Sequence, residues 1–241
     1  MQTDTIVIPS RFCGPQRSGN GGYVCGRLAN YLPGSVCVQL KAPSPLEVEM
    51  RVESRETGAQ LFYESTLVAE ARPFEVDLVP PGAPSYAEAE EASKFFVGFA
   101  DHPFPRCFVC GPQRLPADGM RIFPGLIDAR SLVAAPWIPD PSLANRAQQI
   151  ESVFIWSALD CTGGIALCPV PEGKAIVLGE LCVRIDGTVA PGERCVVIGW
   201  SLGGEGRKRT AGSALYSEAG KPVAVASAIW IEVPRSTFPD Q

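Results

Sequence analysis

The chain has 241 residues, a hydrophobic content of 46% and a formal net charge of −5. This length suits one large domain or two small ones, with enough apolar residues for a full core. The acidic balance excludes the basic surface that nucleic acids or anionic membranes would require.

The start of the chain lacks the basic residues and apolar run of a signal peptide. No stretch approaches the ~20 apolar residues of a membrane-spanning helix. We therefore expect a cytoplasmic protein whose nine cysteines are mostly reduced. Six lie inside apolar patterns and are expected to be small core residues: Cys25, Cys37, Cys161, Cys168, Cys182 and Cys195. The single histidine, His102, excludes any mechanism that needs two.

The first part of the chain predicts one helix among several strands. Asn20 can cap a helix over residues 23–31, which Pro33 and Gly34 end. The expected strands cover residues 4–12, 36–40, 46–53 and 61–71. The proline-rich residues 72–105 predict a linker, in which Ser85 and Glu88 form a capping box that opens a short helix to about residue 96.

The second part is expected to begin at about Cys107 and to contain the most unusual helix. Residues 150–167 are almost wholly apolar around their circumference, with Asp160 in the middle. A carboxylate in such surroundings must be paired, neutralised or used. The expected strands cover residues 120–123, 129–134, 175–185, 194–202, 208–217 and 222–233.

The two halves share an order of strand, buried helix with a Gly-Gly pair, and then antiparallel strands. Gly21-Gly22 recurs as Gly163-Gly164, and Ala42-Pro43 recurs as Ala190-Pro191 at a nearly equal offset. These echoes indicate an internal duplication. The repeated CGPQR at residues 13–17 and 110–114 has a different offset, so it is either chance or another kind of equivalence.

This order resembles the hotdog fold, in which an antiparallel sheet wraps one long helix. Residues 177–233 are similar to the strand tail of acyl-CoA thioesterases, and residues 156–160 resemble the acid-bearing central helix of that superfamily. Residues 20–24 resemble the helix opening of long-chain acyl-CoA thioesterases. The resemblance implies an α+β double hotdog with two antiparallel sheets, each wrapping a central helix. The implied halves are residues 1–71 and 106–241, joined by the linker over 72–105.

Thioester hydrolysis needs a base or nucleophile and donors that hold the oxyanion. Burial should raise the pKa of Asp160, and a helix start supplies backbone N–H groups. Because sites pair across the interface in the resembled superfamily, we expect Asp160, as general base or nucleophile, to face the N–H of Gly22, as oxyanion donor. Asn20 would shape this site and Thr162 would orient the water. The expected substrate-binding residues are Gly21, Gly163, Gly164 and Trp156.

Simpler roles remain open for these residues. Asp160 could cap the following turn, and Asn20 could be a plain N-cap. Glu180 and Glu151 are alternative acids. The His-Gly-Gly opening usual in the resembled family is absent from both halves, and only Asn20 stands in that role.

The segment from His102 to Cys110 carries a Cys-x-x-Cys pair. With His102 nearby and Cys13 further away, Cys107 and Cys110 could bind zinc or form a redox pair, but only one ligand pair is present. We favour a tight turn that packs both cysteines inward, and expect no metal and no cofactor. The segment also resembles a stretch of hotdog-like proteins from actinobacteria, which implies no activity.

The leading hypothesis is hydrolysis of an acyl-CoA or acyl-carrier thioester in an apolar tunnel between the halves. Arg17, Arg207 and Lys208 could meet the phosphates of coenzyme A or simply be solvated. The expected partner is a small-molecule acyl thioester, with no nucleic acid and no membrane, and two double hotdogs could pair as a homodimer. Alternatives are a non-catalytic acyl-binding protein and an enoyl-thioester hydratase or dehydratase.

Overall fold

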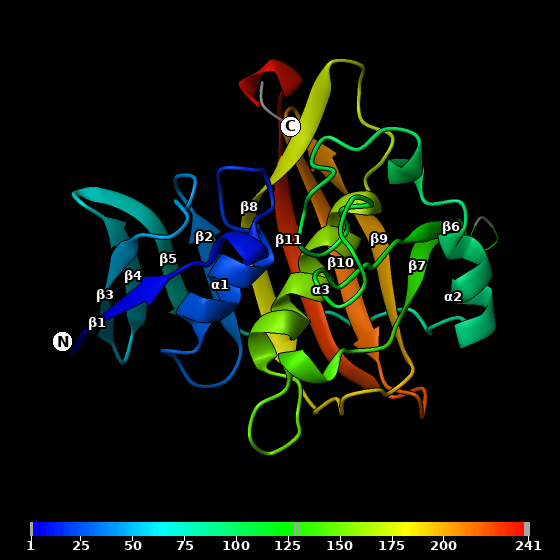
Figure 1. The fold of residues 1–241 in the computed structure, drawn as a ribbon, viewed down its shortest axis with the longest axis horizontal. Coiled ribbons are helices and arrows are strands. Elements are labelled where there is room, and N and C mark those ends of the chain that lie inside the picture. The colour runs from blue at the N-terminus through cyan, green and yellow to red at the C-terminus, as the bar shows by residue number, and fades with distance from the viewer. Residues whose placement is uncertain (1, 128, 130, 239–241) are drawn as a thin grey trace.

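The computed structural model describes residues 2–127, 129 and 131–238. Within these residues, eleven strands form one antiparallel sheet, and helices α1 and α3 lie side by side on one face of it (Figure 1). The α+β class that the sequence predicts is confirmed. No helix in the described part of the chain is long and apolar enough to cross a bilayer.

The first half of the chain builds one side of the sheet. Its elements are β1 (Gln2–Val7), α1 (Gly21–Ala29), β2 (Val36–Leu40), β3 (Glu49–Arg55), β4 (Gly58–Tyr63) and β5 (Thr66–Pro73). Asn20 caps α1 as predicted, because its side-chain oxygen accepts the N–H of Tyr23 at 2.9 Å. The single strand predicted over residues 61–71 is wrong, since β4 and β5 form a hairpin there. Glu64 makes that turn at a φ of 53°, without the glycine or asparagine that usually marks a positive φ.

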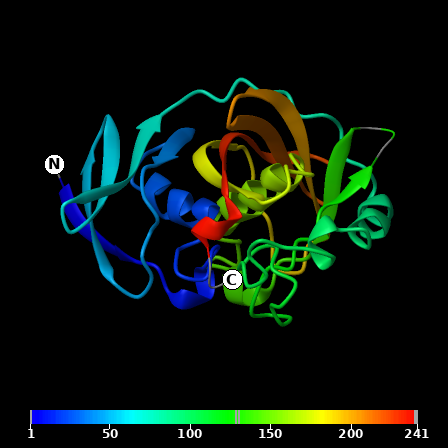
Figure 2. The same cartoon turned by 90° about the horizontal axis from the view of Figure 1, so that it is seen from above.

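The connection between the halves crosses the face of the sheet opposite α1 and α3 (Figure 2). Val76 packs there against Cys37 and Cys182. The connection then forms α2 (Tyr86–Ser93), whose predicted capping box is present, with Ser85 and Glu88 each accepting the other's backbone N–H. Helix α2 packs on β6 and β7, so this segment is a packed part of the structure rather than a free linker.

The second half supplies the longer strands. Its elements are β6 (Gly125–Ile127), β7 (Leu132–Trp137), α3 (Ser152–Ile165), β8 (Lys174–Ile185), β9 (Cys195–Glu205), β10 (Lys208–Tyr216) and β11 (Pro222–Pro234). Residues 120–123 do not form the predicted strand, although Met120 and Ile122 donate to the carbonyls of Phe108 and Val109. Arg130, part of the strand predicted over 129–134, lies outside the described residues. Every residue of α3 from 153 to 164 is buried, which confirms a helix wrapped by other structure.

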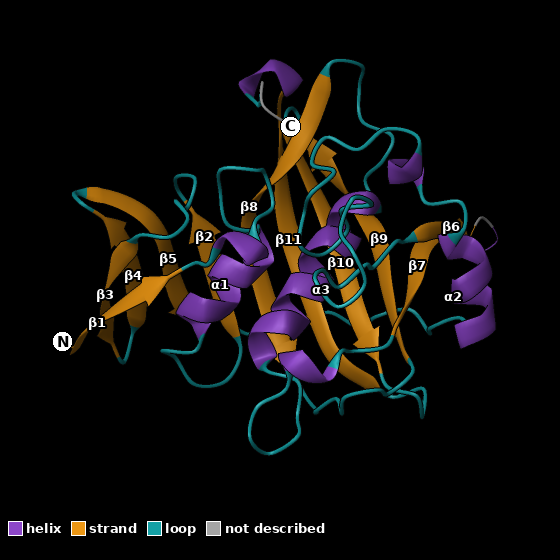
Figure 3. Ribbon diagram, viewed as in Figure 1, coloured by secondary structure: helices purple, strands orange, loops and turns teal. Residues whose placement is uncertain are grey.

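The sheet is continuous rather than divided into two (Figure 3). The strands of the first half lie in the order β1-β3-β4-β5-β2, and those of the second half continue the sheet in the order β8-β11-β10-β9-β7-β6. The two halves meet where β2 lies beside β8, and we call this boundary the seam. Strand β2 pairs antiparallel with β8, because each would otherwise leave an edge of unpaired backbone groups. When β6 is left out, both halves have the same strand order from the outer edge to the seam. The strands β1, β3, β4, β5 and β2 then correspond to β7, β9, β10, β11 and β8.

A disulfide joins Cys37 of β2 to Cys182 of β8 across this seam. The expectation that both are reduced core residues is therefore wrong. The two residues are paired partners in the β2–β8 ladder, so their side chains project from the same face. Sequence spacing did not reveal this pairing, because 145 positions separate the two cysteines.

Candidate functional site

Asp160 of α3 lies against the first turn of α1. The residue is 2% exposed, and Oδ2 of its carboxylate accepts hydrogen bonds from the backbone N–H of Gly22 at 2.7 Å and from the Nδ2 of Asn20 at 3.1 Å. The other oxygen, Oδ1, is buried with no hydrogen-bond partner among the described residues. The structure thus brings together three of the residues that the sequence singled out, contributed by the two halves of the chain.

Gly22 permits this approach because it has no side chain. A Cβ on Gly22 would lie 2.5 Å from the Cβ of Asp160 and 2.6 Å from the carbonyl oxygen of Trp156. Any other residue would push the two helices apart and separate the N–H from the carboxylate.

Burial raises the pKa of Asp160 from 3.8 to about 7, opposed by the hydrogen bonds from Gly22 and Asn20. An Asp carboxyl on a protein surface is almost wholly ionised at neutral pH. Asp160 can instead accept and release a proton there, which suits a general base.

A cavity of about 650 Å³ opens beside Asp160, between the two halves of the molecule. Its lining comes from the start of α1, α3, β8, β11 and residues 97–110. The apolar wall includes Val24, Phe104, Ile176, Leu178 and Trp230. Asn20, Gly21 and Gly164 also line it.

Charged residues lie in the same lining. They are Lys41, Asp101, Lys174 and Arg235, and Arg235 forms a double ion pair with Asp101 at 2.6 and 2.7 Å. The cations named from the sequence, Arg17, Arg207 and Lys208, are not among the described lining residues.

Four of the predicted site residues are not in the described cavity lining, and one of them is Gly22, whose N–H donates to Asp160. Thr162 is fully buried, and its carbonyl oxygen would be 2.4 Å from a Cβ on Gly199 of β9. A Cβ on Gly163 would lie 3.7 Å from Ala211 and from Ser213 of β10. Trp156 packs against Gly26 of α1. The structure therefore groups the other three with the packing of α3.

The alternative acids are placed differently from Asp160. Glu180 lies on β8, 3.9 Å from the guanidinium of Arg72, and Glu151 is an exposed residue at the start of α3. Neither is in the described cavity lining. Of the acids weighed from the sequence, only Asp160 combines burial with contact to a helix start.

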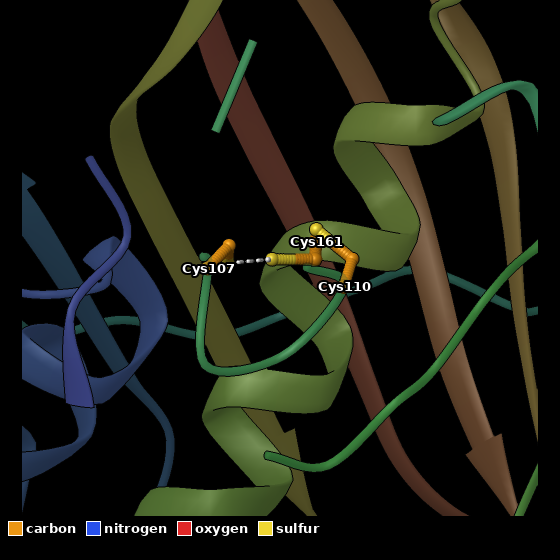
Figure 4. Close-up of side chains that lie close together, drawn as sticks. All are labelled: Cys107, Cys110 and Cys161. Carbon is orange, nitrogen blue, oxygen red and sulfur yellow. Dashed lines mark hydrogen bonds between the residues drawn. The ribbon is translucent and has the colours of Figure 1, made fainter. Parts of the chain in front are cut away.

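Three thiols gather on the same cavity wall. Cys107 and Cys110 reach from their turn toward Cys161 of α3 (Figure 4). All three are buried, and their sulfurs lie within 4.8 Å of one another, with Cys107 and Cys161 3.6 Å apart. The pKa of Cys107 lies well below its usual range, held there first by the thiols of Cys110 and Cys161 and then by the backbone N–H groups of Cys110 and Val109.

Sequence reasoning missed this cluster. Cys161 occupies an apolar helical position, so nothing in its spacing distinguishes it from a small core residue. Cys13, the distant partner considered from the sequence, is outside the cluster, with its sulfur 3.0 Å from the Nη2 of Arg114. His102, expected in a linker, lines the cavity, and its Nε2 is 3.3 Å from the sulfur of Cys110.

The sequence matches no protein-family model and no curated protein. Solved structures do match over nearly the whole chain. A tesB protein of Mycobacterium avium subspecies paratuberculosis is 13% identical with a TM-score of 0.62, covering 96% of this chain and 93% of that one. A candidate thioesterase II from Thermobifida fusca is 13% identical, with a TM-score of 0.62 and coverages of 97% and 93%.

A protein of unknown function with a hot dog fold, from Alicyclobacillus acidocaldarius, is also similar. It is 10% identical, with a TM-score of 0.60, covering 96% of this chain and 93% of that one. At such low identities these likenesses establish the fold, and they confirm the hotdog fold that the sequence predicts.

Proposed function

We propose that this hotdog-fold chain hydrolyses an acyl-CoA or acyl-carrier thioester, with Asp160 as general base. One observation carries the proposal. The buried carboxylate of Asp160 accepts the backbone N–H of Gly22 and lies at the wall of a largely apolar cavity. The names of two structural neighbours, a tesB protein and a candidate thioesterase II, agree with this chemistry.

In the proposed reaction, Asp160 takes a proton from a water molecule as that water attacks the thioester carbonyl. The loss of charge on Asp160 weakens its hold on the Gly22 N–H, which can then donate to the developing oxyanion. The partial positive charge at the start of α1 also stabilises the negative charge on this oxyanion. When the carbon–sulfur bond breaks, Asp160 returns the proton to the leaving thiolate, and a carboxylic acid and a free thiol result.

The proposal includes a double hotdog, in which one chain contains two copies of the fold with the boundaries predicted from the sequence. The shared strand order of the halves supports a duplication. The two helices do not provide equivalent catalytic groups. Counted from the first residue of each helix, the position of Asp160 in α3 corresponds to Ala29 in α1, which cannot act as a base. In this alignment the two Gly-Gly pairs are not equivalent, because one opens α1 and the other lies near the end of α3.

A hydrolysis screen over short, long and aromatic acyl-CoAs tests the proposal. Wild type should release free thiol from at least one of them, and Asp160→Asn should lower kcat by about 10²- to 10⁴-fold, the usual contribution of a general base. Glu180→Gln is the matched control, since it removes an alternative acid outside the cavity and should retain activity. Acyl-CoA binding without hydrolysis, or hydration of an enoyl-CoA instead, would contradict the proposal.

A further inference from the structure

We propose that Cys107, Cys110 and Cys161 bind one zinc ion at the wall of the cavity. The three residues come from two parts of the chain, the turn at 107–111 and helix α3, yet their sulfurs converge on one point. The proposal stands apart from thioester hydrolysis, because metal binding can be read without any substrate.

The distances fit tetrahedral coordination. With zinc–sulfur bonds of about 2.3 Å, two thiolates on one tetrahedral zinc lie about 3.8 Å apart. Cys107 and Cys161 are 3.6 Å apart, and Cys110 completes a triangle with no separation above 4.8 Å. A small movement of Cys110 is enough to close this triangle around the ion.

The cluster lies beside hydrogen-bond donors of neighbouring side chains. The Nδ2 of Asn20 lies 3.8 Å from the sulfur of Cys107. The Nδ2 of Asn20 lies 3.6 Å from the sulfur of Cys161. Zinc binding would release the thiol protons, and the charge of the ion would offset the repulsion among the three buried thiolates.

His102 has a supporting place rather than a ligand's place. Its Nδ1 accepts the backbone N–H of Phe104 at 2.9 Å, so in the neutral ring the proton is on Nε2. That N–H points at the sulfur of Cys110, 3.3 Å away. His102 is therefore a positioning residue that donates to a zinc-bound thiolate, the kind of outer contact that tunes metal sites.

The fourth position of the ion would face the cavity, because all three cysteines belong to its lining. Soft thiolate ligands select zinc over magnesium or calcium. Zinc at this place would fasten the turn at 107–111 to α3, beside Asn20 and Asp160. It would thus fix one wall of the candidate site.

The test is the metal content of the purified, untagged protein, measured by inductively coupled plasma mass spectrometry. We expect about one zinc per wild-type chain and its loss in Cys161→Ser. Cys195→Ser, a buried thiol of β9 outside the cluster, should keep the metal. His102→Ala should weaken zinc affinity by about 10- to 100-fold, measured by competition with a chromophoric chelator.

Cobalt substitution of the wild type keeps the test decisive where a variant fails to fold. Co²⁺ bound by the three cysteines should give a thiolate-to-cobalt charge-transfer band in the near ultraviolet. Protein that binds neither Zn²⁺ nor Co²⁺ would overturn the proposal. A disulfide within the cluster would also overturn the proposal. It would appear as an intact mass two units lower than that of the protein with all three thiols reduced, and peptide mapping would locate it.

Discussion

At the scale of single residues, the contact between Gly22 and Asp160 decides what the candidate site can do. The N–H of Gly22 stabilises the carboxylate, while burial destabilises it, and the pKa near 7 reflects the balance. The sequence indicated both residues from an isolated acid in an apolar helix and a Gly-Gly pair at a helix start. It could not indicate the thiol of Cys161, because a metal ligand and a core cysteine look alike until the turn at 107–111 is placed beside it.

Gly22→Ala should destabilise the protein, because the added methyl group would overlap Asp160 and the carbonyl of Trp156. We expect a loss of about 1–3 kcal/mol in the free energy of unfolding, measured with urea. Gly163→Ala is the matched control in the other helix, where a methyl group meets Ala211 and Ser213 at about ordinary contact distance. Because alanine favours helix over glycine by about 0.5–1 kcal/mol, the control should be neutral or stabilising. Equal losses in both variants would show that the contact at Gly22 is not special.

At the scale of elements, the helices and long strands followed from periodicity, and the errors came at turns. Residues 61–71 look like one strand because Glu64 turns the chain without glycine or proline. Residues 120–123 look like a strand but pair only with the irregular residues 108 and 109. The seam between β2 and β8 depends on two segments more than a hundred positions apart, so local pattern could not show that one sheet forms instead of two.

The two helix starts lead to a prediction about stoichiometry. The start of α1 faces Asp160, whereas at the start of α3 the hydroxyl of Ser152 donates to the Oδ1 of Asn30 at 2.9 Å. We expect one binding site per chain despite two copies of the fold. Isothermal titration with a non-hydrolysable acyl-CoA analogue should give one equivalent per chain. Two equivalents would mean that the second helix start also binds.

At the scale of the whole molecule, the disulfide between Cys37 and Cys182 ties the two halves together. A cross-link over 145 positions restricts the unfolded chain strongly, and we expect it to contribute about 3–5 kcal/mol to the free energy of unfolding. Dithiothreitol should therefore lower the midpoint of thermal unfolding of wild type, measured by circular dichroism. The double variant Cys37→Ala, Cys182→Ala should already unfold early and should not respond to the reductant. Alkylation of Cys37 in the native, unreduced protein would contradict the prediction.

This cross-link also bears on what a protease could do to the molecule. A nick in the segment behind the sheet, near residues 77–84, would leave two polypeptides that differ in length but share one covalent bond through Cys37 and Cys182. On a denaturing gel without reductant, the cut protein would migrate as one species, and reductant would separate the two fragments. Its two pieces would stay in register along β2 and β8, so that Gly22 of one fragment would still face Asp160 of the other.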